Sequence, residues 1–123
     1  MGNWRVLVVE DEPDGQAVVT SLLSHYQISA EAVDNAEDAL HSLSRDQYDA
    51  IVIDLMLPGM DGLELVQTIR RDPTMRDLPC LAITAYHTSR VKADALDYGF
   101  DGYFAKPLKP DVFMGRLNQL MTN

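Results

Sequence analysis

The run Ile-Val-Ile-Asp at residues 51–54 is the feature that most constrains how this chain folds. Three apolar, β-branched residues end at a carboxylate, and Pro58 and Gly59 then prevent the strand from continuing. A continuous apolar run is typical of a strand buried on both faces, as in a parallel sheet. Open α/β sheets place their chemistry at the carboxyl ends of such strands. Asp54 is therefore the first candidate site residue, although an aspartate at a strand end can also be simply solvated.

Strands and helices are expected to alternate along the whole chain. Strands are expected at residues 5–9, 29–33, 51–54, 79–84 and 102–105. Helices are expected at residues 13–26, 35–43, 61–72, 91–98 and 110–121. This rhythm is that of right-handed βαβ units, so the sequence predicts an α/β fold: three layers around a doubly wound, five-stranded parallel sheet. Without a linker or low-complexity tract, residues 1–123 are expected to form one domain.

Composition narrows the class of function. A hydrophobic content of 46% suits a globular core, and no apolar run approaches the ~20 residues that span a bilayer. We therefore expect a cytoplasmic protein without membrane association. The net charge of −9 argues against direct nucleic-acid binding, which needs clustered Lys and Arg. Cys80, the single cysteine, excludes an intrachain disulfide and is expected to be a small core residue.

Polar residues stand at the carboxyl ends of four of the expected strands. They are Glu10 and Asp11 after the first, Asp54 at the end of the third, Thr84 at the end of the fourth, and Lys106 after the fifth. Because every strand of a parallel doubly wound sheet ends on the same edge, we expect these side chains to form one site. The site combines three acids, one hydroxyl and one cation.

Such a cluster of carboxylates needs compensating charge. Two like charges ~4 Å apart repel by about 1 to 4 kcal/mol at effective dielectric constants of 80 to 20. Oxygen-only ligands suit Mg²⁺, which retains waters that a phosphoryl oxygen can replace. Lys106 and the Thr84 hydroxyl can then contact the other phosphoryl oxygens while a carboxylate attacks the phosphorus. The sequence has no Gly-rich nucleotide cradle, so the donor is expected to be another protein or a small phosphodonor.

With these residues in place, the chain resembles the receiver domain of two-component response regulators, the chemotaxis-regulator-like family. The resemblance runs from Arg5 to about Met121. It is carried by four segments: Val8-Val9-Glu10-Asp11-Glu12, Asp54-Leu55-Met56-Leu57-Pro58-Gly59-Met60-Asp61-Gly62, Thr84-Ala85 and Tyr103-Phe104-Ala105-Lys106-Pro107-Leu108. The resemblance implies the flavodoxin-like strand order 2-1-3-4-5, which places the first and third strands side by side.

The resemblance also implies roles in a phosphorelay. Asp54 is expected to accept a phosphoryl group from a sensor histidine kinase or a histidine phosphotransfer protein. Glu10 and Asp11 are expected to hold Mg²⁺ together with Asp54 and the backbone carbonyl of Met56. Glu10 stands where many members have Asp, so its longer side chain can also contact the metal through water. Lys106 is expected to pair with the phosphate.

A conformational switch is the implied output. Thr84 is expected to turn towards the phosphate while the Tyr103 ring moves inward, although a half-buried aromatic at a strand end can also be purely structural. The Lys106-Pro107 peptide bond is expected to be cis. The switch acts on a downstream effector protein or a fused output domain. Such a protein is not an enzyme in the ordinary sense, because it catalyses only its own phosphorylation and dephosphorylation.

Two other classes of function remain open at this point. The first is a phosphatase with an aspartate nucleophile, but such enzymes usually have a second acid two residues after the nucleophile, where this chain has Met56. The second is a binding module of the same fold that is not phosphorylated or that binds flavin. The complete set of acids, hydroxyl and lysine opposes a vestigial site, and the acidic edge opposes a phosphate-bearing flavin.

Overall fold

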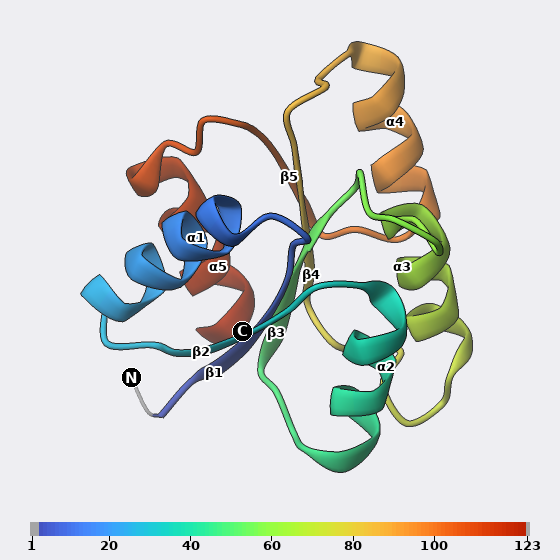
Figure 1. Ribbon diagram of the computed structural model, residues 1–123, viewed down its shortest axis with the longest axis horizontal. Helices are drawn as coiled ribbons and strands as arrows, with labels where there is room; N and C mark the ends of the chain where they lie inside the picture. Colours follow the sequence, from blue (N-terminus) through green and yellow to red (C-terminus); the bar gives the residue numbers. More distant parts are fainter. Residues whose placement is uncertain (1–2, 123) are drawn as a thin grey trace.

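The computed structural model describes residues 3–122, which form five strands and five helices in strict alternation (Figure 1). Their bounds are β1 Arg5–Val9, α1 Pro13–His25, β2 Ser29–Val33, α2 Ala36–Arg45, β3 Ala50–Asp54, α3 Gly62–Arg71, β4 Cys80–Thr84, α4 Ser89–Tyr98, β5 Gly102–Ala105 and α5 Pro110–Thr122. The predicted alternation is confirmed.

All strand pairs are parallel and lie in the order β2-β1-β3-β4-β5, so the predicted flavodoxin-like topology is also confirmed. Val9 of β1 is paired with Ile53 of β3, which brings the residues after β1 beside the end of β3. On the other side of β3, Asp54 is paired with Ile83 of β4. The register therefore aligns the carboxyl ends of the three central strands.

Helices cover both faces of the sheet. Figure 1 shows α1 and α5 on one face and α2, α3 and α4 on the other. Within β1, Leu7 and Val9 pack with the α2–α4 side, whereas Val6 and Val8 pack with the α1–α5 side. Because both faces of the strand are covered, successive residues must all be apolar. This is the physical reason for the continuous apolar runs in the sequence.

Side-chain caps define the starts of three helices. The side chains of Asn35, Asp61 and Thr88 each accept a hydrogen bond from a backbone N–H three residues later, at 2.8, 2.9 and 3.0 Å. Such caps satisfy amides that have no partner within the helix. The Thr88 cap also explains why α4 begins at Ser89, two residues before the predicted start.

Two details of the packing differ from the periodic pattern. In α1 the sequence offers two i,i+4 apolar pairs, but the structure buries Val19 and Leu23 and leaves Val18 57% exposed. In α3 the helical spacing of Leu63, Val66 and Ile69 suggests one apolar face, but the structure fully buries Leu65 with Val66 and Ile69 and leaves Leu63 half-buried. Neighbouring apolar residues compete for one helix face, and only contact with the sheet decides between them.

Cys80 is fully buried as a free thiol, as predicted. Across residues 3–122, none of the helices combines the length and the apolar character needed to cross a lipid bilayer.

Candidate phosphoacceptor site

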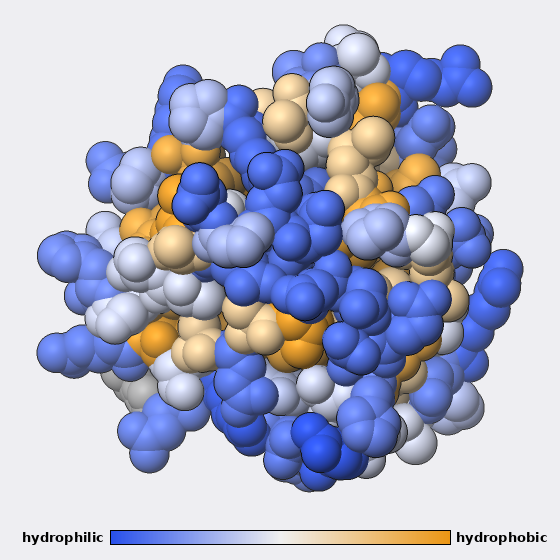
Figure 2. Space-filling view, in the orientation of Figure 1, coloured by the Kyte–Doolittle hydropathy of each residue, from blue (hydrophilic) through white to orange (hydrophobic). Residues whose placement is uncertain are grey.

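The fold gathers the predicted polar residues at one edge of the sheet. Asp54 and Thr84 are the last residues of β3 and β4, and Lys106 follows the last residue of β5. Glu10 and Asp11 follow β1 directly. Figure 2 shows hydrophilic residues over the centre of the view, where β1 ends in Figure 1. The parallel topology thus produces the spatial arrangement that the sequence predicted.

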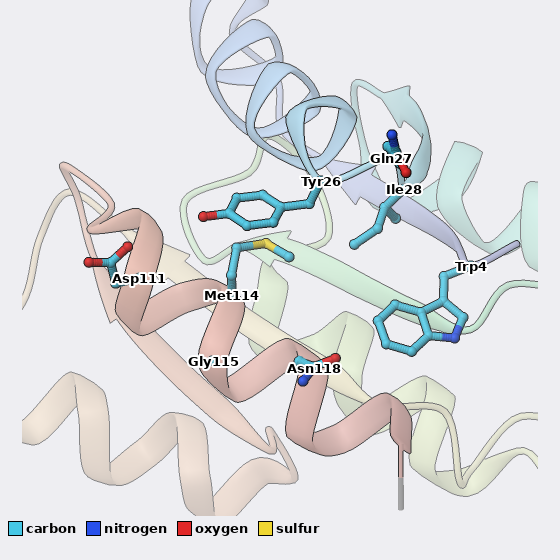
Figure 3. A pocket seen from close by; sticks show the side chains of 8 residues that line it. All are labelled: Trp4, Tyr26, Gln27, Ile28, Asp111, Met114, Gly115 and Asn118. Atoms are coloured by element: carbon cyan, nitrogen blue, oxygen red, sulfur yellow. The ribbon is translucent and has the colours of Figure 1, made fainter. Parts of the chain in front are cut away.

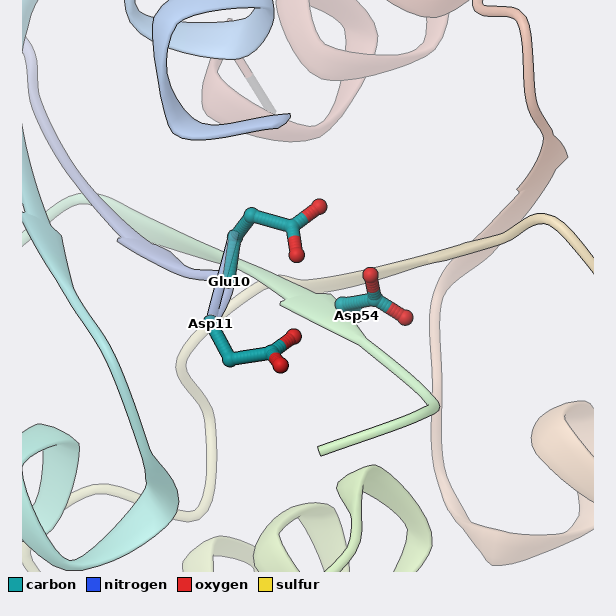
Figure 4. Close-up of side chains that lie close together, drawn as sticks. All are labelled: Glu10, Asp11 and Asp54. Atoms are coloured by element: carbon teal, nitrogen blue, oxygen red, sulfur yellow. The ribbon is translucent and has the colours of Figure 1, made fainter. Parts of the chain in front are cut away.

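Three carboxylates converge at this edge. Glu10, Asp11 and Asp54 each offer an oxygen, and these oxygens all lie within 4.8 Å of one another (Figure 4). Glu10 is fully buried and Asp54 is 5% exposed, whereas Asp11 is exposed. Like charges at such separations repel, more strongly where water is excluded. The cluster therefore requires a cation.

Lys106 supplies part of the compensating charge. Its Nζ donates hydrogen bonds to Glu10 Oε1 at 2.5 Å and to Asp54 Oδ2 at 2.8 Å. The same ammonium thus bridges residues from the ends of β1 and β3, and it is itself placed by the end of β5. The Lys106-Pro107 peptide bond that follows is cis, as predicted.

The pKa values of the bridged groups follow from this environment. Burial raises the pKa of Glu10 above its ordinary value, and the charge of Asp54 adds to this, although the hydrogen bond from Lys106 opposes it. Burial by itself would lower the pKa of Lys106, but its hydrogen bonds with Asp54 and Glu10 raise it instead. The lysine is therefore held in its charged form between two acids.

Backbone amides and one unpredicted side chain fix the acids in place. The N–H of Met56 donates to Asp54 Oδ1 at 2.9 Å, which leaves Asp54 Oδ2 with Lys106. Gln16 of α1 donates from Nε2 to the backbone oxygen of Glu10 at 2.7 Å and to Asp34 Oδ1 at 2.9 Å. Sequence analysis did not identify Gln16, because a glutamine near the start of a helix carries no distinguishing pattern.

The two residues expected to form the switch lie on neighbouring strands of the same sheet region. Thr84 is almost fully buried, and its Oγ1 accepts a hydrogen bond from the N–H of Tyr86 at 3.0 Å. The Tyr103 hydroxyl is hydrogen-bonded to Nδ1 of His87 at 2.9 Å, and partial burial raises its pKa. His87 was also missed by sequence analysis, because its loop position gives no hint of a contact with β5.

The donor set at this edge fits a magnesium ion. All the candidate side-chain ligands are carboxylates, whose oxygens a hard divalent cation prefers. Within the described residues, no thiolate or imidazole belongs to this cluster. Lys106 bonds two of the three carboxyl groups, so a divalent cation would balance the remaining negative charge.

A cavity lies away from this edge, in a different part of the fold. It has a volume of about 480 Å³ between the end of α1, the start of β1 and one side of α5. Figure 3 shows Tyr26 beside Met114, and Trp4 towards Asn118. None of the carboxylates of the acidic cluster lines it. We therefore assign the chemistry to the sheet edge.

A doubly wound parallel α/β sheet with an acid cluster bridged by a lysine at its edge is the arrangement found in a known class of signalling domains. The profile of the response regulator receiver domain matches residues 6–118. The chain therefore belongs to the receiver domain family of two-component response regulators. Members of this class are signalling switches and not classical enzymes.

Relatives with similar sequences include transcriptional regulators. The chain is 35% identical over 116 residues to the transcriptional regulatory protein TcrA of Mycobacterium tuberculosis, covering 94% of this chain and 45% of TcrA. It is 30% identical over 117 residues to the phosphate regulon transcriptional regulatory protein PhoB of Klebsiella pneumoniae, covering 95% of this chain and 51% of PhoB. The chain thus spans about half the length of these two relatives.

Solved receiver domains share the whole fold. The receiver domain of sensor histidine kinase PA1611 from Pseudomonas aeruginosa superposes with a TM-score of 0.90 at 30% identity, covering 99% of this chain and all of that chain. That structure has a magnesium ion coordinated in its active-site cleft. The receiver domain of the Francisella response regulator 1452 gives a TM-score of 0.89 at 28% identity, with 98% of each chain covered.

Proposed function

We propose that this chain is the phosphoacceptor switch of a two-component phosphorelay, with Asp54 as the phosphorylated residue. The observation that carries the proposal is the bridge from Lys106 to both Glu10 and Asp54 within the acid cluster. A purely structural ion pair needs one acid for one base. Here one lysine lies among three carboxyl groups. Lys106 can therefore release a carboxylate and pair with an incoming phosphoryl group instead.

In the proposed reaction, an Asp54 carboxylate oxygen attacks the phosphorus of a phosphohistidine on the donor protein. A P–O bond forms as the P–N bond breaks, and the imidazole leaves with a proton taken from water. The Met56 N–H orients one Asp54 oxygen through its hydrogen bond to Oδ1. Lys106 already contacts the other oxygen and pairs with the negative charge of the phosphoryl group as it arrives. The chain thereby catalyses only its own phosphorylation and, with water as the attacking group, its own dephosphorylation.

Glu10, Asp11 and Asp54, with the backbone carbonyl of Met56, are the proposed ligands of Mg²⁺. When bound, the ion would supply positive charge to the carboxylates and to the phosphoryl oxygens. The 4.8 Å grouping of carboxylate oxygens and the magnesium ion in the PA1611 receiver domain support this ligand set.

The proposed output is a change at Thr84 and Tyr103. The Thr84 hydroxyl accepts a hydrogen bond from Tyr86, so its own proton remains available to a phosphoryl oxygen. Tyr103 is hydrogen-bonded to His87 and is proposed to move inward when Thr84 turns. Phosphorylation then shifts a two-state equilibrium that a partner surface reports.

A sensor histidine kinase or a histidine phosphotransfer protein is the proposed donor, and an effector protein or a fused output domain is the proposed receiver of the signal. The likeness to about half the length of TcrA and PhoB, both transcriptional regulatory proteins, supports this assignment. The reducing cytoplasm is the proposed location, which suits a single cysteine present as a free thiol. Neither nucleic acid nor a membrane is proposed as a direct partner.

The test is phosphorylation with a small phosphodonor followed by intact-mass measurement. The native chain is expected to gain the mass of one phosphoryl group in the presence of Mg²⁺ and to lose this gain when the metal is chelated. Asp54→Asn removes the nucleophile at nearly constant shape and is expected to show no gain. A metal-independent gain, or a gain that persists in Asp54→Asn, would contradict the proposal.

A further inference from the structure

Helix α1 passes against the side chain of Glu10 at Gly15, the third residue of the helix. A Cβ placed on Gly15 would lie 2.3 Å from Glu10 Oε1, 2.6 Å from its Cδ and 2.9 Å from its Cγ. Non-bonded carbon and oxygen atoms do not approach this closely. Any residue other than glycine at position 15 would therefore place its Cβ in the space that the Glu10 carboxylate occupies.

The carboxylate is also held by Lys106. Glu10 Oε1, the atom nearest to Gly15, also accepts the hydrogen bond from Lys106. Glu10 is fully buried, so it has no solvent-facing position into which it can turn without leaving the cluster. In Figure 4 its carboxylate points towards α1, with Asp11 and Asp54 on the far side.

The backbone of Glu10 is fixed by the residue that follows Gly15. Gln16 donates from Nε2 to the backbone oxygen of Glu10 at 2.7 Å. With the main chain held by Gln16 and one carboxylate oxygen held by Lys106, the side chain cannot withdraw from α1 as a unit. The first turns of α1 thus determine the position of the Glu10 carboxylate, the longest of the candidate ligands.

We propose that Gly15 is a positioning residue for the metal and phosphoryl site. By lacking a side chain, it lets a glutamate at position 10 keep its carboxylate beside Lys106, set back from Asp11 and Asp54. A glycine inside a helix normally reduces stability, because it loses more backbone entropy than alanine. At position 15 this loss is offset by the space that the buried carboxylate needs. The role in metal binding rests on the proposed function, whereas the packing role does not.

Alanine at position 15 would move the Glu10 carboxylate away from α1. The displacement weakens its bond with Lys106 and brings its charge closer to Asp11 and Asp54. Repulsion then rises when no metal is bound, whereas a bound divalent cation would gain a nearer third carboxylate. Gly15→Ala is therefore expected to reduce the stability of the metal-free chain and to tighten Mg²⁺ binding.

The first experiment measures the melting temperature of the metal-free chain in a double-mutant cycle. Gly115→Ala is the matched control, because Gly115 is also inside a helix and a Cβ there meets nothing within 4 Å. It is expected to raise Tm by about 2–4 °C, the ordinary effect of replacing a helix glycine. Gly15→Ala is expected to lower Tm, but to raise it when added to Glu10→Ala, which removes all three Glu10 atoms that the new Cβ would meet.

The second experiment measures Mg²⁺ affinity by titration calorimetry. Gly15→Ala is expected to tighten binding about three- to ten-fold, and Gly115→Ala to leave it unchanged. A Gly15→Ala variant as stable as Gly115→Ala would overturn the proposal, as would equal losses of stability in the native chain and in the Glu10→Ala background. Unaltered Mg²⁺ affinity would overturn its metal-binding part. Failure of Asp54 to accept phosphate would contradict the proposed function. The melting temperatures would still test the packing role of Gly15, which does not depend on that function.

Discussion

Two partly buried clusters of charge in this molecule are built on opposite plans. Arg70 of α3 lies in the first, where its guanidinium donates to the backbone oxygens of Gly99, Arg76 and Leu78 and to the carboxylate of Asp101. Lys106 lies in the second, where its ammonium donates hydrogen bonds to Glu10 and Asp54 beside the exposed Asp11.

The two clusters differ in charge balance and in how many of their hydrogen-bonding groups have partners. In the Arg70 cluster one guanidinium meets one carboxylate and several carbonyl groups, and Asp101 Oδ2 also accepts the N–H of Cys80 at 2.9 Å. In the Lys106 cluster one cation bonds two of the three carboxyl groups, Glu10 and Asp54, and the third, Asp11, lies beside them. A charge-balanced cluster with saturated hydrogen bonds stabilises the fold, whereas a cluster with surplus acid is ready for an added cation.

The largest effect is expected from Arg70→Met, which approximates the length of the side chain and removes its donors. Loss of the hydrogen bonds that join α3 to the start of β4 and the end of α4 is expected to lower the free energy of unfolding by about 2–4 kcal/mol. Urea denaturation measures this loss. Mg²⁺ is expected to restore none of it, and a full restoration by Mg²⁺ would show that the two clusters are not independent.

A smaller loss of stability is expected from Lys106→Met, and here, unlike in Arg70→Met, Mg²⁺ is expected to reverse it. Removal of the ammonium leaves Glu10 and Asp54 without their cation and is expected to lower the free energy of unfolding by about 1–3 kcal/mol without metal. Mg²⁺ is expected to restore most of this, because a divalent cation can neutralise the same carboxylates. The response to phosphorylation is expected to be lost even though Asp54 remains intact. If the variant fails to fold at saturating Mg²⁺, Lys106 is primarily structural.

The smallest effect is expected at alkaline pH from Cys80, which lies beside the Arg70 cluster. Burial raises the pKa of the Cys80 thiol from 9.0 to about 12, against an opposing effect of Arg70. A folded-state pKa above the unfolded value contributes stability that is complete below pH 9 and is lost as pH rises towards 12. The native chain is therefore expected to lose about 1 kcal/mol more than Cys80→Ala between pH 9 and 10. Denaturation of both proteins at each pH measures the difference, and parallel curves would mean that the thiol ionises freely in the folded chain.

Most of the fold was predictable because its signals are local. The apolar runs of β1, β3 and β4 identify doubly covered strands, and caps such as Asn35 and Asp61 mark where helices begin. The strand order itself came from the family resemblance. Which pair of apolar residues in α1 faces the core was not predictable, because Val18 and Val19 are equivalent in sequence and only the sheet distinguishes them.

The site was predictable to the extent that it follows from strand ends. Parallel topology requires Asp11, Asp54 and Lys106 to approach the same edge, so their residue types and positions sufficed to predict that they would meet. The contacts of Gln16 with the Glu10 backbone and of His87 with Tyr103 were not predictable. Both join segments whose distance depends on how a helix or loop packs, which no local pattern records.

The sequence by itself determined the alternation of strands and helices, the edge at which polar groups gather and the chemical character of that edge. Only the tertiary structure decided that one lysine bridges Glu10 and Asp54, and that α1 leaves room for the longer acid at Gly15. The reason is physical: periodicity and residue type act over a few neighbours, whereas hydrogen-bond partners and steric space are set by atoms from distant segments that meet only in the folded chain.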